Sequence, residues 1–259
     1  MDNLINTPAR STQLSKKSTL PSREDIIKAF FDLPLLPSQS ELWHHRQQMD
    51  NYYAHTKSYL VEADELILKQ QLGHVGTLLD WLLLDKRSLD YVDGAEEPIQ
   101  LILSRLKNID HWDAYDLQIM SMAITYHVSA KAALRTLDRC EQALIHYEDQ
   151  DFIERLRLRL YVNLSTRLLH FRFHGESLAP DALKASFHHL VDKAIALCES
   201  QQQPVLAQAL QVRKALADNH GQELLAHLKK LQAIAPHSVY RDVLFHVRHY
   251  RALVVMPAR

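Results

Sequence analysis

Glycine is scarce in this sequence. The 259 residues include only five, and these, with the nine prolines, fall almost entirely between periodic segments. Active sites that cradle a phosphate or expose a nucleophile on a tight turn depend on glycine, and the chain has no phosphate loop, nucleophile elbow or Cys-x-x-Cys motif. We therefore predict that the protein is not an enzyme and that it binds no cofactor.

Cysteine and long apolar runs are scarce as well. Cys140 and Cys198 have no paired spacing, which favours reduced, buried thiols over a disulfide framework or a zinc site. No run of about eighteen uncharged apolar residues occurs, and the opening residues MDNLINTPARST lack the apolar core of a signal peptide. These absences predict a cytoplasmic protein that does not enter a membrane.

Neither positive nor negative charge predominates overall, since 31 acidic residues balance 30 lysines and arginines. The first 23 residues are an exception, because they hold four basic residues against Asp2 alone. Histidine is abundant, with sixteen residues, and His170 and His174 lie one helical turn apart. However, no HExxH motif or third ligand completes this or any other histidine pair, so we predict no metal site.

Helical periods fill most of the chain, and no alternating Val/Ile/Thr-rich run predicts a pair of strands. Short turns separate the predicted helices, a pattern typical of stacked helical hairpins. No clear copy of the tetratricopeptide (TPR) consensus occurs. The predicted fold is therefore all-α, a degenerate TPR-like solenoid of helical hairpins with a small N-terminal helical segment. The expected body helices span 99–109, 112–128, 130–147, 151–173, 179–200, 204–219, 222–234 and 239–254.

The longest helical period without an internal glycine or proline runs from Asp151 to Gly175. One stripe on this helix is apolar and consists of Phe152, Leu156, Leu160, Leu164 and Leu168. A second stripe beside it consists of Arg155, Arg159, Asn163 and Arg167. Guanidinium and amide groups suit the main chain and the carboxylates of a peptide. The alternative is a solvated face with ion pairs. If this stripe is an exposed groove face, Asn163→Ala and Arg159→Ala should weaken peptide binding and change stability by less than about 1 kcal/mol. A larger loss of stability would instead place these residues in the structural framework.

The first 42 residues carry four short runs: TQLSK at 12–16, LPS at 20–22, IIK at 26–28 and SEL at 40–42. Together they resemble the back half of a helix-turn-helix domain of the phage-repressor type. This resemblance implies DNA contacts from Ser11, Gln13, Lys16 and Lys17. Only about ten residues remain for the two helices that should precede them, so the head would be truncated. The alternative is a pair of helices that cap a helical protein.

Two further segments carry a second resemblance. The run ILSRL at 102–106 followed by IDHWDAYDL at 109–117, and then LYVNL at 160–164, resembles the Rgg (MutR, GadR) regulators of Gram-positive bacteria, with Tyr-Asp where that family has Tyr-Glu. The resemblance implies a helical-repeat domain that dimerises and binds a short signalling peptide, with a head that binds promoter DNA. It also implies that Asn163 holds the peptide main chain. The predicted peptide-binding residues are Tyr126, Arg155, Arg159, Asn163 and Arg167.

The sequence thus favours an Rgg-like transcription regulator that acts as a homodimer. Its expected domains are a head over residues 1–40, a connecting helix over 41–72 and a peptide-binding and dimerisation domain over 73–259. The alternative is a helical-repeat interaction scaffold that never binds DNA. In the final helix, an apolar strip predicts either a dimer contact or the cap of the solenoid; it consists of Tyr240, Leu244, Phe245 and Leu253.

Overall fold

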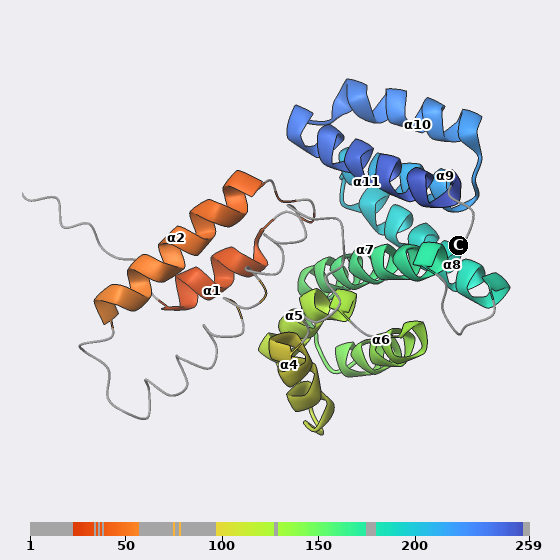
Figure 1. Cartoon of the computed structure of the whole chain (residues 1–259). Coiled ribbons are helices and arrows are strands. Elements are labelled where there is room, and N and C mark those ends of the chain that lie inside the picture. Colours follow the sequence, from red (N-terminus) through yellow and green to blue (C-terminus); the bar gives the residue numbers. More distant parts are fainter. Residues whose placement is uncertain are drawn as a thin grey trace, which may run out of the picture.

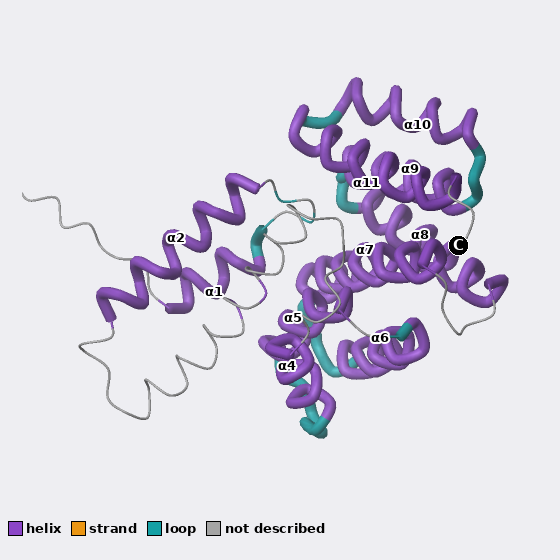
Figure 2. Tube along the Cα trace, in the orientation of Figure 1, coloured by secondary structure: helices purple, strands orange, loops and turns teal. Residues whose placement is uncertain are grey.

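The computed structural model describes residues 23–33, 35, 37, 39–56, 75, 78, 97–126, 129–174 and 180–255. Within these ranges all regular structure is helical and no strand occurs (Figure 2), so the all-α prediction is confirmed. None of the helices in this part of the chain combines the length and the apolar character that a membrane span requires.

Two helices near the N-terminus pack against each other. They are α1 (Arg23–Phe31) and α2 (Gln39–Thr56), and Figure 1 shows them side by side. Ile26 and Phe30 of α1 are buried, as is Leu42 of α2, which explains the pairing by burial of apolar surface. Residues 1–22 and 57–72 lie outside the described residues, so the predicted division into a head and a connecting helix stays a prediction.

The body helices follow the predicted order, with ends that shift by a few residues. They are α4 (Glu97–Lys107), α5 (Ala114–Ala123), α6 (Ala130–Leu144), α7 (Gln150–His174), α8 (Pro180–Ser200), α9 (Pro204–Ala217), α10 (Gly221–Ile234) and α11 (His237–Val255), with a 3-10 turn η1 (Ile124–Tyr126) after α5. Helices α7 to α10 each pack against the next in sequence, and α11 folds back onto α9 and α7.

Helix α7 lies at the centre of the body (Figure 1), in contact with α5, α6, η1, α8, α9 and α11. Its buried residues lie on more than the one predicted stripe, because Leu158, Tyr161 and Val162 are buried together with Leu160 and Leu164. A helix that buries residues on more than one face packs against several neighbours rather than lying at the edge of the protein. The charged stripe of α7 is therefore close to neighbouring elements.

The turns after α8 and α9 share one geometry. Gln202 and Asn219 have positive φ angles of 53° and 57°, the left-handed conformation that ends helices. The following amides, of Gln203 and His220, each donate to the carbonyl five residues earlier, at 2.8 and 3.1 Å. This hydrogen-bond pattern is a Schellman motif. It reverses the chain after α8 and fixes residues 201–203 beside α7.

Helices α8 and α9 are also joined by polar contacts. The Asp218 carboxylate, at the end of α9, lies 2.8 Å from Lys184 Nζ and 3.0 Å from His188 Nε2, both on α8. Burial raises the pKa of this carboxyl, but the hydrogen bond from Lys184 and the charge of His188 outweigh burial, and the pKa falls below its ordinary value. The contacts therefore stabilise the ionised form.

Candidate functional site

The polar stripe of α7 is not a uniformly solvated face. Arg167 is only 7% exposed, and its guanidinium carbon lies 4.2 Å from the centre of the Phe171 ring. The half-buried Asn163 donates from Nδ2 to the main-chain oxygen of Ser121, on α5, at 2.8 Å. The prediction that this stripe is exposed is wrong for Arg167, which is buried.

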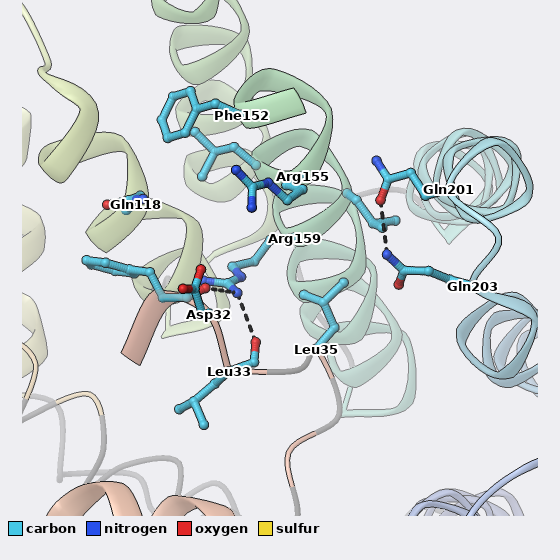
Figure 3. Close-up of a pocket in the computed structure, with 12 residues that line it drawn as sticks. Asp32, Leu33, Leu35, Gln118, Phe152, Arg155, Arg159, Gln201 and Gln203 are labelled. Atoms are coloured by element: carbon cyan, nitrogen blue, oxygen red, sulfur yellow. Dashed lines mark hydrogen bonds between the residues drawn. The ribbon is translucent and has the colours of Figure 1, made fainter. Parts of the chain in front are cut away.

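Arg159 binds main-chain carbonyl groups of its own chain. Its Nη2 donates to the main-chain oxygens of Phe31 at 2.5 Å and Leu33 at 3.1 Å (Figure 3). Burial lowers the pKa of the guanidinium to about 10, with the Asp32 charge opposing that shift and Arg155 adding to it. Arg159 is therefore still protonated at neutral pH, and it holds main-chain carbonyls from another part of its own chain.

A pocket of about 380 Å³ lies beside this contact. Helix α7 forms its floor, residues 31–33 and 35 form one wall, and α5 and the turn after α8 complete it (Figure 3). We call it the α7 pocket; its lining residues are Phe31, Asp32, Leu33, Leu35, Gln118, Phe152, Arg155, Leu156, Leu158, Arg159, Gln201 and Gln203. Two guanidinium groups face one carboxylate in this lining, so the charge of the described pocket is positive.

A second, more apolar pocket of about 320 Å³ adjoins the first. Its lining consists of Leu35, Gln203, Pro204, Val205, Leu206, Pro236 and Val239. Both pockets share Leu35 and Gln203. Leu35 therefore stands between a polar pocket on α7 and an apolar pocket formed by the start of α9 and the turn before α11.

The structure brings together two of the five predicted peptide-binding residues, Arg155 and Arg159. Arg155 is exposed, and its Nε donates to the main-chain oxygen of Asp151 at 3.2 Å. The other three predicted residues do not line either pocket. Of these, Tyr126 lies in η1, where its main-chain oxygen accepts a hydrogen bond from Gln100 at 3.3 Å.

Residues 31–33 and 35 are the part of the site that sequence reasoning missed. The sequence did contain a signal, because prolines follow at positions 34 and 37. A residue before proline is disfavoured in the helical conformation, so Leu33 cannot readily continue α1. Carbonyl groups at such a helix end need partners outside the helix, and Arg159 supplies a donor for two of them.

The run that carried the second resemblance has a structural role here. Trp112 Nε1 donates to the Leu106 main-chain oxygen at 2.7 Å, and the Arg139 guanidinium lies 4.1 Å from the centre of the Trp112 ring. Asp113 and Asp116 form a reciprocal capping box that starts α5. These contacts fix the connection between α4 and α5.

The remaining predictions concern DNA contacts, metal ligands and the apolar strip of the final helix. Ser11, Gln13, Lys16 and Lys17 lie outside the described residues. Within the described ranges, no three histidine, cysteine or acidic residues are placed to hold a metal ion. In the apolar strip of α11, Phe245 is 47% exposed, whereas Tyr240 and Leu244 pack partly against the core. The side chain of Leu253 lies outside the described part.

Comparisons of this chain with protein-family models, with curated proteins and with solved structures found no match. The function must therefore be argued from the site itself.

Proposed function

We propose that this protein is a helical peptide receptor whose α7 pocket holds a polypeptide segment by its main chain. The observation that carries the proposal is the pair of hydrogen bonds from Arg159 to the carbonyls of Phe31 and Leu33. Phe31 is the last residue of α1 and Leu33 lies in the bend that follows, so neither carbonyl continues the hydrogen bonds of a helix. A planar guanidinium can bind both of them without reference to the side chains.

The lining of the α7 pocket supports the same function. Phe152 and Leu156 provide apolar surface, while Gln118, Gln201 and Gln203 provide amide donors and acceptors at its border. Its volume of about 380 Å³ lies in the range of about 300–1,000 Å³ that is usual for ligand pockets. Apolar surface with a few oriented polar groups is the composition expected of a peptide-binding pocket.

The packing order supports a helical-repeat architecture around this pocket. Helices α7, α8, α9 and α10 contact one another in sequence, as stacked helical hairpins do. We include the degenerate TPR-like solenoid in the proposal. In such a fold each hairpin extends a continuous surface, on which a short peptide can contact residues from several helices.

A displayed library of random heptapeptides, selected on the immobilised full-length chain, tests the proposal. Selected peptides are labelled, and their affinities are measured by fluorescence anisotropy for the native protein and for Arg155→Ala. We expect Arg155→Ala to weaken binding by about tenfold or more, the usual cost of losing a charged hydrogen bond. The matched control is Arg135→Ala, an exposed arginine on α6 outside both pockets. Equal loss in both variants, or no selected peptide, would contradict the proposal.

A finer hypothesis adds DNA. An Rgg-like regulator in the cytoplasm would pass peptide binding through a homodimer to a head that binds a promoter. Its support is the resemblance of the sequence, and residues 11–17 carry its DNA contacts. Operator binding that weakens with salt and disappears when residues 1–38 are removed would support this hypothesis. Absence of any such binding would favour the interaction scaffold, which keeps the peptide pocket and lacks the DNA function.

A further inference from the structure

One wall of the α7 pocket is a segment that reaches it from the end of α1. Residues 31–33 and 35, which we call the resident segment, contribute two main-chain carbonyls to Arg159 and four residues to the pocket lining. Phe31 anchors the segment, because it is buried and its ring meets the Tyr115 ring edge-on at 6.1 Å. Leu35, at the other end, lies where the two pockets adjoin.

The side chains of the resident segment complement the pocket. Asp32 lies close enough to Arg159 to favour its charged form. In the part of the chain that the structure describes, Arg155 has no ion pair with a carboxylate, and its Nε donates to a main-chain oxygen instead. The pocket can therefore accept a further negative charge. The aromatic, acidic and aliphatic side chains of the resident segment thus meet an aromatic ring, an arginine and apolar surface, respectively.

Resting on the peptide-receptor function proposed above, we propose that the ligand is a short peptide with the chemistry of the resident segment, and that this segment competes with it. The ligand carries an aromatic or large apolar residue, then an acidic residue, then aliphatic residues. The carbonyls of the ligand take the place of those of Phe31 and Leu33 on Arg159. Its carboxylate pairs with the two arginines, and an aliphatic side chain fills the position of Leu35.

Competition from the resident segment should weaken the binding of a free peptide. A segment tethered close to its binding site has an effective concentration of the order of millimolar. The apparent affinity of a free peptide equals its intrinsic affinity multiplied by the fraction of molecules in which the site is vacant. If the segment occupies the pocket in about nine molecules of ten, its removal tightens peptide binding about tenfold.

The experiment uses the labelled peptide Phe-Asp-Leu-Pro-Leu, the sequence of residues 31–35, with fluorescence anisotropy as readout. The probe is titrated into the full-length native chain and into Leu35→Asp, which places a charge where the resident segment meets apolar surface. Leu101→Asp is the matched control, because Leu101 is 67% exposed on α4 and lines neither pocket. A second probe, Phe-Lys-Leu-Pro-Leu, tests the requirement for an acidic residue.

We expect the acidic probe to bind Leu35→Asp about tenfold more tightly than the native chain or Leu101→Asp. We expect the lysine probe to bind at least about tenfold more weakly than the acidic probe. Equal affinity of the acidic probe for all three proteins would overturn the competition, and equal affinity of the two probes would overturn the ligand chemistry. If library peptides bind through Arg155 while the acidic probe does not, the receptor function stands and this inference fails. If nothing binds any variant, both fail.

Discussion

The substitution Asn163→Ala tests whether Asn163 lies on an exposed stripe, as the sequence pattern predicts, or connects two helices, as in the structure. An exposed asparagine on a solvated stripe would tolerate alanine with a change of less than about 1 kcal/mol. In the structure, however, Asn163 Nδ2 donates to the Ser121 oxygen at 2.8 Å. Ser121 lies in the last turn of α5, where a helix leaves carbonyls that need outside partners. The substitution therefore removes the side-chain link between α5 and α7.

The expected cost follows from two contributions. The lost hydrogen bond is worth about 1 kcal/mol, and a carbonyl left without its partner in a partly buried place costs about 1–3 kcal/mol. Some of the second cost is recovered if water enters, so we expect a loss of about 2 kcal/mol. For a chain of this length that corresponds to a fall in Tm of about 4–8 °C.

Urea unfolding followed by circular dichroism measures this loss, with thermal unfolding as a second readout. Arg155→Ala is the internal control, because Arg155 lies on the same stripe of α7 but is exposed. It should change stability by less than about 0.5 kcal/mol. If Asn163→Ala also falls within about 0.5 kcal/mol of the native chain, the link between α7 and α5 does not contribute to stability and our reasoning is refuted.

Three further predictions concern the core and its titrating groups. Phe187→Ala, at a fully buried position of α8, should cost about 3–5 kcal/mol in urea unfolding, whereas Leu101→Ala should be nearly neutral. The pKa of Asp218 is lowered, so the stability from its contacts with α8 is present above pH 3.8 and is lost as the pH falls through the pKa of the folded state. Asp218→Asn should remove this acid-dependent loss of stability and cost about 1 kcal/mol at pH 7. Burial, with a smaller effect of the neighbouring histidine, lowers the pKa of His45 below 6.5, and the unfolded state therefore binds more protons near that pH. The protection of α1 and α2 amides from hydrogen exchange, measured relative to the intrinsic exchange rate at each pH, should decrease as the pH falls below 6.5. The variant His45→Leu should abolish this decrease, and an unchanged pH profile of protection in that variant would contradict the assignment.

The helices could be predicted because their signals are local. Apolar periodicity and the positions of glycine and proline place α7 and its neighbours to within a few residues. The turn at Gln202 is different, since glutamine has no preference for the left-handed conformation that it adopts there. The sequence predicts the break before Pro204, but not the turn geometry that brings Gln203 to the pocket.

The role of the polar stripe could not be predicted in the same way. Periodicity groups Arg159 and Asn163 on one face, but it does not say what that face meets. The partner of Arg159 lies 128 residues away in sequence, at Phe31. A usable signal was present in the buried Leu158 and Val162, which are apolar residues off the main stripe. They indicate a central helix, whose polar residues should be expected to contact other parts of the protein.

Arg159 couples the end of α1 to the α7 pocket. The same guanidinium holds the end of α1 and borders the space that the proposed ligand would fill. If a ligand takes over its two hydrogen bonds, α1 loses them, so binding and release of the resident segment are one equilibrium. Linkage then requires two factors to be equal. The first is the factor by which Leu35→Asp increases the affinity of the chain for the probe. The second is the factor by which the same substitution reduces the probe-induced increase in the released population of the segment. Amide exchange at residues 31–33, measured with and without probe, provides the second factor independently of the first. Agreement of the two factors requires that ligand and segment exclude each other at Arg159, whereas tighter binding without a change in exchange would require a second site.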